Sequence, residues 1–294
     1  MNYFFETAAN ILGNTKLRTP QIEAYIKAQD HFASSREDAL IVLPTGTGKS
    51  GLISILPFGL ANGRVLIVTP NLVTKQSIRK TQELLEDNFL INQDVIFSAD
   101  DLPVICEYNS KTLSSSLEQS HFVFSNIQQV HSERAGCLTK RVSRDFFDLI
   151  IIDEGHHAPA ETWQRTLGYF AKAKKIFITG TPFRGDKQEV PGKLIHETPL
   201  SEVMRDRYVK WLRKETVNAH ELYFTLAEQP DVRLSKDEVL ALKDKEWLER
   251  SVALSPECSM DVIERSIANL SELRKVSPKV PHKILAVGCS ISHA

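Results

Sequence analysis

A glycine-rich segment with a lysine near its end, residues 43–50 (LPTGTGKS, the glycine loop), directly follows an apolar run. Gly46 and Gly48 can adopt backbone angles closed to other residues, so that successive N–H groups turn inward and approach phosphate oxygens. The Lys49 ammonium can then reach the β and γ phosphates, and the Ser50 hydroxyl can bind Mg²⁺. The segment begins with leucine where the general pattern has glycine. A strand, this loop and a helix in succession predict a nucleotide-binding protein.

An acidic pair, Asp153 and Glu154, stands about 100 residues further on, at the end of a second apolar run. Ligands of open parallel sheets bind beyond the carboxyl ends of the strands, so this pair should reach the same edge as the glycine loop. Asp153 would hold Mg²⁺, mostly through water. Glu154 can orient and deprotonate an attacking water. An acidic pair after a strand can also cap a helix, but the glycine loop upstream favours catalysis.

Two histidines and a Thr-Gly-Thr turn complete the candidate site. His156 and His157 are adjacent, which is the wrong spacing for two metal ligands on one helix face, and we expect His156 to act as a polar relay. Thr179 and Thr181 lie at the next strand end, where their hydroxyls could bond the acidic loop around a tight turn at Gly180. Taken in isolation, these last residues would be an ordinary turn.

Length and composition are those of a globular protein with one large or two small domains in 294 residues. Lysine and arginine number 36 against 37 acidic residues, so any nucleic-acid surface must be a local patch. The sequence shows neither a membrane-length apolar stretch nor a secretory signal, and we expect a cytoplasmic protein. The four cysteines are far apart, which favours buried or incidental thiols over a zinc site or a disulfide framework.

Between residues 17 and 190, short apolar runs alternate with helix-like segments. This alternation predicts an α/β fold: a mostly parallel sheet with helices on both faces. The expected strands are residues 39–43, 64–69, 95–97, 121–125, 148–152 and 175–179, with helices over 72–89 and 110–119. The order of the strands in the sheet cannot be predicted from the sequence.

The amino-acid composition changes beyond residue 185, where a segment rich in charged residues and proline precedes a mostly helical stretch. Residues 235–253 and 260–276 have helical spacing, and the second gives one apolar stripe. Prolines then break the helix before a fresh strand at 283–288. The expected division is a lead-in (1–16), an ATP-binding lobe (17–215), a mainly helical linker or insertion (216–281) and the first strand of a truncated second lobe (282–294). The stripe consists of Val262, Ile263, Ile267, Leu270 and Leu273.

The motifs at residues 44–50 (PTGTGKS), 153–156 (DEGH) and 179–182 (TGTP) resemble, in this order, motifs I, II and III of superfamily 2 helicases. The Asp-Glu-x-His form is similar to the DExH group, which includes the helicase subunits of type I and type III restriction enzymes. The resemblance implies the first RecA-like motor lobe of a P-loop NTPase that uses ATP and Mg²⁺. It implies that Lys49, Asp153, Glu154 and His156 are catalytic and that Thr179 and Thr181 couple the nucleotide state to strand-binding loops.

Shorter elements extend the resemblance. Residues 17–21 (LRTPQ) resemble the element whose glutamine, here Gln21, contacts adenine; a solvent-facing glutamine is the alternative. Regions resembling motifs Ia and Ib imply contacts to a sugar-phosphate backbone, although each alone could be an ordinary strand-to-helix turn. The backbone contacts would come from Thr69, Pro70, Asn71, Ser125 and Asn126. The nucleotide would be held by Gln21, Pro44, Thr45, Gly46, Thr47, Gly48, Lys49 and Ser50, and its Mg²⁺ by Ser50 and Asp153.

The resemblance therefore implies the ATP-binding motor lobe of an ATP-dependent DNA (or RNA) helicase or translocase, with DNA the expected substrate, a partner subunit and a role in restriction-type or anti-phage defence. The glutamine and arginine cluster of the family's second lobe does not occur here, so we expect ATP binding with slow hydrolysis and no unwinding by this chain alone. Two other hypotheses are an ATP-gated nucleic-acid-binding module without unwinding activity and a P-loop ATPase that acts on protein.

Overall fold

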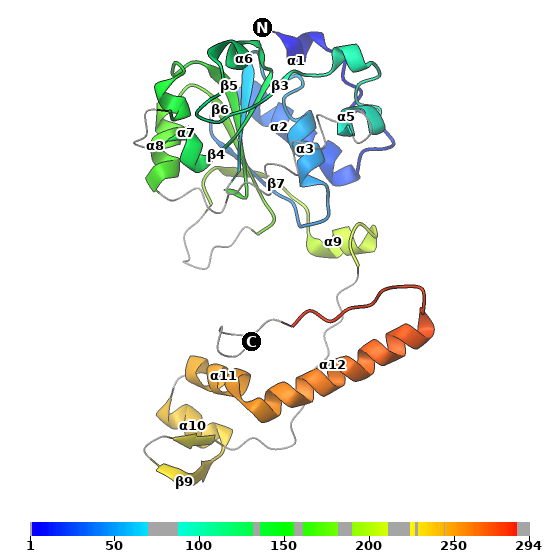
Figure 1. Ribbon diagram of the computed structural model, residues 1–294, viewed down its shortest axis with the longest axis vertical. Coiled ribbons are helices and arrows are strands. Elements are labelled where there is room, and N and C mark those ends of the chain that lie inside the picture. The colour runs from blue at the N-terminus through cyan, green and yellow to red at the C-terminus, as the bar shows by residue number, and fades with distance from the viewer. Residues whose placement is uncertain are drawn as a thin grey trace. The chain divides into compact units, whose positions relative to one another are not determined.

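The chain divides into two compact units, residues 1–211 and 212–294 (Figure 1). The computed structural model describes residues 2–69, 88–131, 136–155, 161–181, 190–210, 224–226, 229–243 and 245–286. The helix expected over 72–89 lies almost wholly outside these residues. None of the described helices combines the length and the apolar character that crossing a membrane requires.

The first unit is built on a seven-stranded sheet in the order β3-β4-β2-β5-β6-β1-β7. All neighbouring strands in it run parallel, which confirms the predicted α/β fold. The central strands are buried along nearly their whole length, as expected where helices cover both faces of a parallel sheet. The strands are β1 (Ala39–Val42), β2 (Arg64–Thr69), β3 (Ile105–Glu107), β4 (Phe122–Asn126), β5 (Phe147–Asp153), β6 (Lys174–Thr179) and β7 (Lys193–Glu197).

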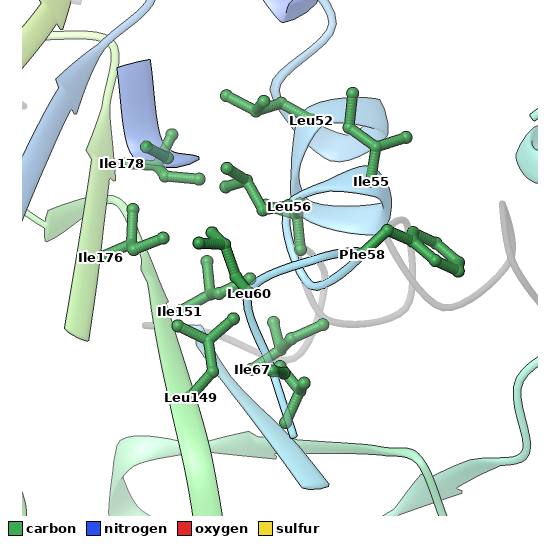
Figure 2. Packing of buried hydrophobic residues seen from close by; sticks show 14 of the residues in the cluster. Leu52, Ile55, Leu56, Phe58, Leu60, Ile67, Leu149, Ile151, Ile176 and Ile178 are labelled. Carbon is green, nitrogen blue, oxygen red and sulfur yellow. The ribbon is translucent and has the colours of Figure 1, made fainter. Parts of the chain in front are cut away.

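Side chains alternate between the two faces of the sheet and so belong to two hydrophobic clusters. On β5, Leu149 and Ile151 pack in the cluster beneath α3, whereas Ile150 and Ile152 belong to the other (Figure 2). The first cluster includes residues of α1 (Tyr3–Glu6), α2 (Thr19–Ser34), α3 (Lys49–Ile55) and α5 (Phe89–Asn92), and the second includes residues of α6 (Ser114–Gln119), α7 (Ile127–Val130) and α8 (Glu161–Tyr169). Short 3-10 turns lie at Ala99–Asp101 and Leu138–Lys140, and α9 (Leu200–Arg205) follows β7.

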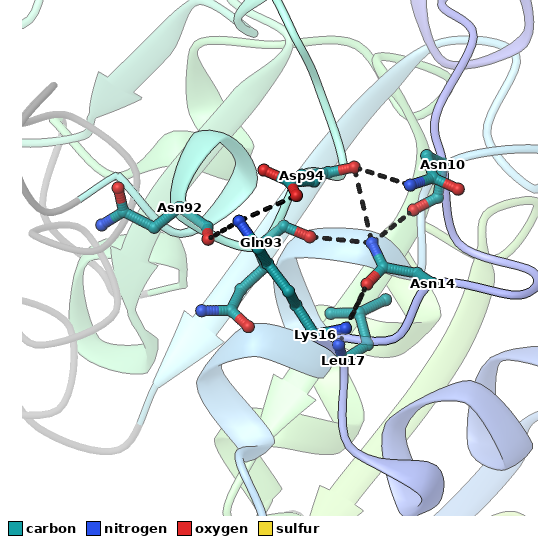
Figure 3. Close-up of polar contacts among 7 residues, drawn as sticks. All are labelled: Asn10, Asn14, Lys16, Leu17, Asn92, Gln93 and Asp94. Atoms are coloured by element: carbon teal, nitrogen blue, oxygen red, sulfur yellow. Dashed lines mark hydrogen bonds and ion pairs between the residues drawn. The ribbon is translucent and has the colours of Figure 1, made fainter.

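The segment before α2 is fixed by a polar network centred on Asn14, whose side chain is buried (Figure 3). The Asn14 amide donates to the backbone oxygens of Asn10 at 2.9 Å and Gln93 at 2.8 Å. Its oxygen accepts from the Lys16 N–H at 2.8 Å and from the Leu17 N–H at 3.1 Å. Because every polar atom of this amide is bonded, the network holds the segment before α2 against the residues that follow α5.

The sequence prediction of a strand at 95–97 is wrong. Val95 and Ile96 are buried, but both backbone N–H groups donate to the Leu90 oxygen and close the end of α5. Asp94 makes this possible by adopting a left-handed conformation, at φ 53°. The strand that extends the sheet beside β4 is β3 instead, and β7 adds an edge strand that the sequence analysis did not predict.

Within its described residues, the second unit combines a small hairpin with three helices, so the region predicted as mainly helical also contains strands. Strands β8 (Phe224–Leu226) and β9 (Gln229–Leu234) pair antiparallel. Lys243 is extended, and it ends the first half of the helix expected over 235–253. The predicted strand at 283–288 is absent from 283–286, where we find no strand partner among the described residues to bond its backbone. The helices are α10 (Lys236–Leu242), α11 (Lys245–Leu254) and α12 (Pro256–Val276).

The apolar stripe predicted on α12 exists but is not buried. Val262, Ile263, Ile267 and Leu273 each expose about half of their surface, and α12 contributes no buried residue. Among the residues of this unit that the structure describes, the small buried core consists instead of Phe224, Val239 and Leu248.

The centre of the sheet should dominate the stability of the first unit. We expect Leu149→Ala to lower the free energy of unfolding by about 2–5 kcal/mol, because it empties a fully buried site. The matched control is Leu194→Ala on edge strand β7, where leucine is 51% exposed and the loss should stay below about 1 kcal/mol. Urea denaturation measures both, and equal losses would contradict the burial pattern.

Candidate functional site

Three adjacent strands end at the candidate site. The glycine loop follows β1, Asp153 ends β5 and Thr179 ends β6. Strand β6 lies between the other two, so the loop and the acidic pair are separated by one strand. The end of β1 is tied to this middle strand, because the Leu43 N–H donates to the Thr179 oxygen at 2.9 Å.

The glycine loop has the backbone conformation that its glycines permit. Gly46 and Gly48 lie at φ 92° and 96°, where residues with a Cβ are strained. Thr47 is buried between them, and its hydroxyl donates to the Pro44 oxygen at 2.7 Å. Helix α3 starts directly after Gly48, at Lys49.

Lys49 crosses the end of β6 to meet the acidic pair. Its Nζ lies 3.8 Å from the Glu154 Oε1, with both side chains partly shielded from solvent. A Cβ on Gly180 would lie 2.9 Å from this Nζ, closer than such contacts normally come. Gly180, expected from the sequence only to allow a tight turn, also leaves room for the lysine amine.

Asp153 is 3% exposed, and its pKa is raised to about 6. Burial is the main cause and the neighbouring Glu154 charge adds to it, while the Lys49 ammonium acts in the opposite direction. The Asp153 Oδ1 is buried without a hydrogen-bond partner among the residues that the structure describes. A buried carboxylate oxygen with free lone pairs fits a Mg²⁺ ligand, directly or through water.

Glu154 adopts a left-handed backbone conformation, at φ 53°. Non-glycine residues seldom adopt this conformation, which costs on the order of 1 kcal/mol or more. Consecutive side chains of a strand point to opposite faces, yet the carboxylates of Asp153 and Glu154 both interact with the Lys49 ammonium, which is consistent with a sharp turn directly after β5.

Two other residues predicted to act in the site, Gln21 and Thr179, are buried and hydrogen-bonded. Gln21 is buried; its amide nitrogen donates to the Gly48 oxygen at 2.8 Å, and its amide oxygen accepts from the Arg18 N–H at 2.9 Å. Thr179 is buried, and its hydroxyl contacts the Thr181 backbone oxygen at 3.0 Å. The roles of these groups toward adenine and in coupling stay predictions, and His156 lies outside the described residues.

Three of the predicted nucleic-acid contacts, Thr69, Ser125 and Asn126, lie at the ends of the paired strands β2 and β4. Thr69 and Ser125 have no exposed surface, and Asn126 caps α7 by accepting from the Gln129 N–H at 2.9 Å. In this arrangement the two hydroxyls are covered by protein. Pro70 and Asn71 lie outside the described residues, and the whole set remains a prediction.

Two further residues, Arg18 and Tyr208, lie against the glycine loop and were not predicted from the sequence. The Arg18 guanidinium donates to the Gly46 oxygen, and its carbon lies 5.1 Å from the centre of the Tyr208 ring. Arg18 lies in the same LRTPQ element as Gln21, three residues before it, so its role at the site could have been predicted from this position. Nothing local in the sequence points to Tyr208, because it follows α9 far along the chain.

A parallel sheet whose strand ends carry this loop and this acidic pair, together with a match to a family model, identifies the first unit as a helicase-like first motor lobe. The family model described as "Type III restriction enzyme, res subunit" matches residues 14–184, more than half of the sequence, and the chain belongs to this family. The match ends before the second unit begins.

Two curated relatives are each 25% identical to the chain. An Escherichia coli type I restriction enzyme EcoAI endonuclease subunit aligns over 168 residues, 55% of this chain and 19% of its own length. A putative helicase 22 of a Sulfolobus islandicus filamentous virus aligns over 206 residues, 67% of this chain and 34% of its own length. The chain thus spans about a fifth to a third of the length of these relatives.

Solved structures of similar fold include the Pyrococcus furiosus Hef helicase domain, with a TM-score of 0.49 at 20% identity over 67% of this chain and 42% of that one. The type ISP restriction-modification enzyme LlaGI, in complex with a DNA substrate mimic, has a TM-score of 0.48 at 15% identity over 92% of this chain and 25% of that one. The family assignment therefore rests on the family model alone.

The raised pKa of Asp153 predicts a stability effect with a definite sign. The pKa of Asp153 is about 6 in the folded protein, against 3.8 for an unperturbed carboxyl group. The contribution of Asp153 to the free energy of unfolding therefore falls as the pH rises from about 4 through 6, and then levels off. Asp153→Asn should therefore stabilise the nucleotide-free protein at pH 7.5, by up to about 3 kcal/mol, and hardly at pH 3.5. Urea denaturation across this range, with exposed Asp145→Asn as control, measures the difference. A pH-independent difference would contradict the assignment.

Proposed function

We propose that the first unit binds ATP with Mg²⁺ and, with a second motor lobe, hydrolyses it to move along nucleic acid as a helicase or translocase. The observation that carries this proposal is the convergence of Lys49 with the acidic pair across Gly180, the Lys49 Nζ lying 3.8 Å from Glu154. One cation and two carboxylates beside a loop shaped by two glycines suit a triphosphate and its metal ion.

Each side chain of the site has a proposed part. Lys49 offsets the charge of the β and γ phosphates, and the Ser50 hydroxyl and Asp153 carboxylate hold Mg²⁺. When bound, the ion would offset the negative charge of the phosphates and so favour attack by water. Glu154, turned toward the same edge by its backbone, orients the attacking water and accepts its proton. Thr179 and Thr181 pass the nucleotide state to the strand ends on the far side of β5.

The wider activity belongs to a longer protein in this proposal. One relative is a subunit of a type I restriction enzyme, which supports DNA over RNA, a partner subunit and a role in restriction-type defence. A cytoplasmic setting would accompany that role. A second lobe would supply the arginine that stabilises the transferring phosphate, worth about 10³ or more in rate. If DNA fails to stimulate turnover of the two-lobe protein, an ATP-gated binding module becomes the better description.

ATP binding can be tested on this chain directly. We expect Lys49→Ala to weaken ATP binding by about 100-fold or more, because the site loses the cation nearest the phosphates. Lys172→Ala removes a highly exposed lysine paired with Asp145 and should leave ATP affinity unchanged. Isothermal titration calorimetry in the presence of Mg²⁺ gives both values, and unchanged affinity in the Lys49 variant would remove the basis of the proposed function.

Glu154→Gln separates binding from chemistry. The amide keeps the size of the side chain but cannot accept the proton of the attacking water, so the rate of ATP hydrolysis should fall by about 10²–10⁴ while ATP affinity stays within a factor of about three. The measurement is phosphate release by a protein carrying both lobes, with Glu202→Gln as a surface control. Normal turnover in the Glu154 variant would place the base elsewhere.

A further inference from the structure

Two side chains at the start of α2 bind the glycine loop from outside. The Arg18 guanidinium donates to the Gly46 oxygen, and the Gln21 amide donates to the Gly48 oxygen at 2.8 Å. The Gln21 side chain is also tied to the Arg18 backbone, because the Arg18 main-chain N–H donates to the Gln21 side-chain oxygen at 2.9 Å. Both left-handed glycines of the loop thus have their carbonyl oxygens held by neighbouring protein.

The direction of these oxygens fixes the direction of the N–H groups that follow. In a trans peptide the C=O and the next N–H point in opposite directions. A Gly46 oxygen held outward therefore turns the Thr47 N–H inward, where it reaches the Pro44 oxygen across the loop at 3.3 Å. This long bond leaves the N–H available to a stronger acceptor, such as a phosphate oxygen.

Arg18 is held in turn by the segment that follows α9. Its guanidinium carbon lies 5.1 Å from the centre of the Tyr208 ring, within cation–π range. The same segment lies against the loop. A Cβ atom added to Gly46 would lie 3.7 Å from the backbone oxygen of Tyr208 and 2.5 Å from the Cγ1 of Val209. The chain turns here because Arg207 is left-handed, at φ 61°, and the Tyr208 N–H donates to the Val203 oxygen at 3.0 Å.

We propose that Arg18, held in place by the Tyr208 ring, is a positioning residue that sets the glycine loop for phosphate before the nucleotide arrives. This inference deepens the proposed function, since the loop matters only if it binds phosphate. The polar network around Asn14 supports it by fixing the backbone immediately before Arg18. Arg18 acts through the Gly46 peptide, and Tyr208 acts through Arg18.

The first test needs no nucleotide. Amide hydrogen exchange of the glycine loop is measured in the unliganded chain. Arg18→Ala should speed exchange at Thr47 by about tenfold or more, since a charge-assisted hydrogen bond is lost. Tyr208→Ala should speed it by about threefold, and Tyr208→Phe, which keeps the ring, should match the wild type. Unchanged exchange in Arg18→Ala, or equal effects of the two Tyr208 variants, would overturn the proposal.

The second test is ATP affinity by calorimetry. We expect losses of about tenfold for Arg18→Ala and threefold for Tyr208→Ala, with the double variant no weaker than Arg18→Ala alone, because one residue acts through the other. Arg18→Lys keeps the charge without the planar fork and should recover little affinity. Lys27→Ala, which removes an exposed charge from the same helix, should change nothing. Additive losses, or full recovery with lysine, would overturn the positioning role.

The two tests fail separately. If the wild type does not bind ATP, the proposed function falls while hydrogen exchange still decides whether Arg18 and Tyr208 order the loop. If the wild type and the Arg18 variants bind ATP equally, the function stands and the positioning role falls. Thermal melting checks that each variant is folded. If Arg18→Ala does not fold, the comparison of Tyr208→Ala with Tyr208→Phe still tests the positioning role.

Discussion

The site depends on one constraint: a lysine on one side of a strand must reach carboxylates on the other side. Strand β6 separates the glycine loop from the acidic pair, and Gly180 leaves the space through which the Lys49 amine passes. The attraction between the ammonium and the acidic pair then offsets part of the cost of burying Asp153 beside a second negative charge. Without this crossing, the three strand ends would carry separate groups rather than one site.

The charge balance suits a site that exchanges ligands. A lysine–glutamate pair separated by 3.8 Å and partly exposed contributes little stability, so a phosphate can take over the ammonium at small cost. Asp153 has the opposite character, because it is buried, has its pKa raised and keeps one oxygen unpartnered among the described residues. A cation satisfies that oxygen better than the unliganded protein does. In the proposed function, the nucleotide would bind the Lys49 ammonium and the metal ion would bind the unpartnered oxygen of Asp153.

Much of the first unit could be predicted because its strands are continuous apolar runs buried on both faces. The same reasoning failed at Val95 and Ile96, which are apolar and buried but whose N–H groups close a helix end instead of joining the sheet. It missed β7, an edge strand with mostly exposed side chains, because solvent on that edge leaves no apolar pattern to detect. In the second unit, the α12 stripe was predicted correctly as a pattern, yet burial did not follow from it.

The sequence by itself determined which groups are present and which follow a strand: the glycines, Lys49, the acidic pair and the Thr-Gly-Thr turn. These are local properties, set by residue type and by spacing along the chain. The tertiary structure alone decided that β6 lies between β1 and β5, that Gly180 faces Lys49, and that Arg18 and Tyr208 hold the outside of the loop. Such contacts join residues far apart in sequence, and they are selected by strand pairing and burial over the whole lobe, which no local pattern records.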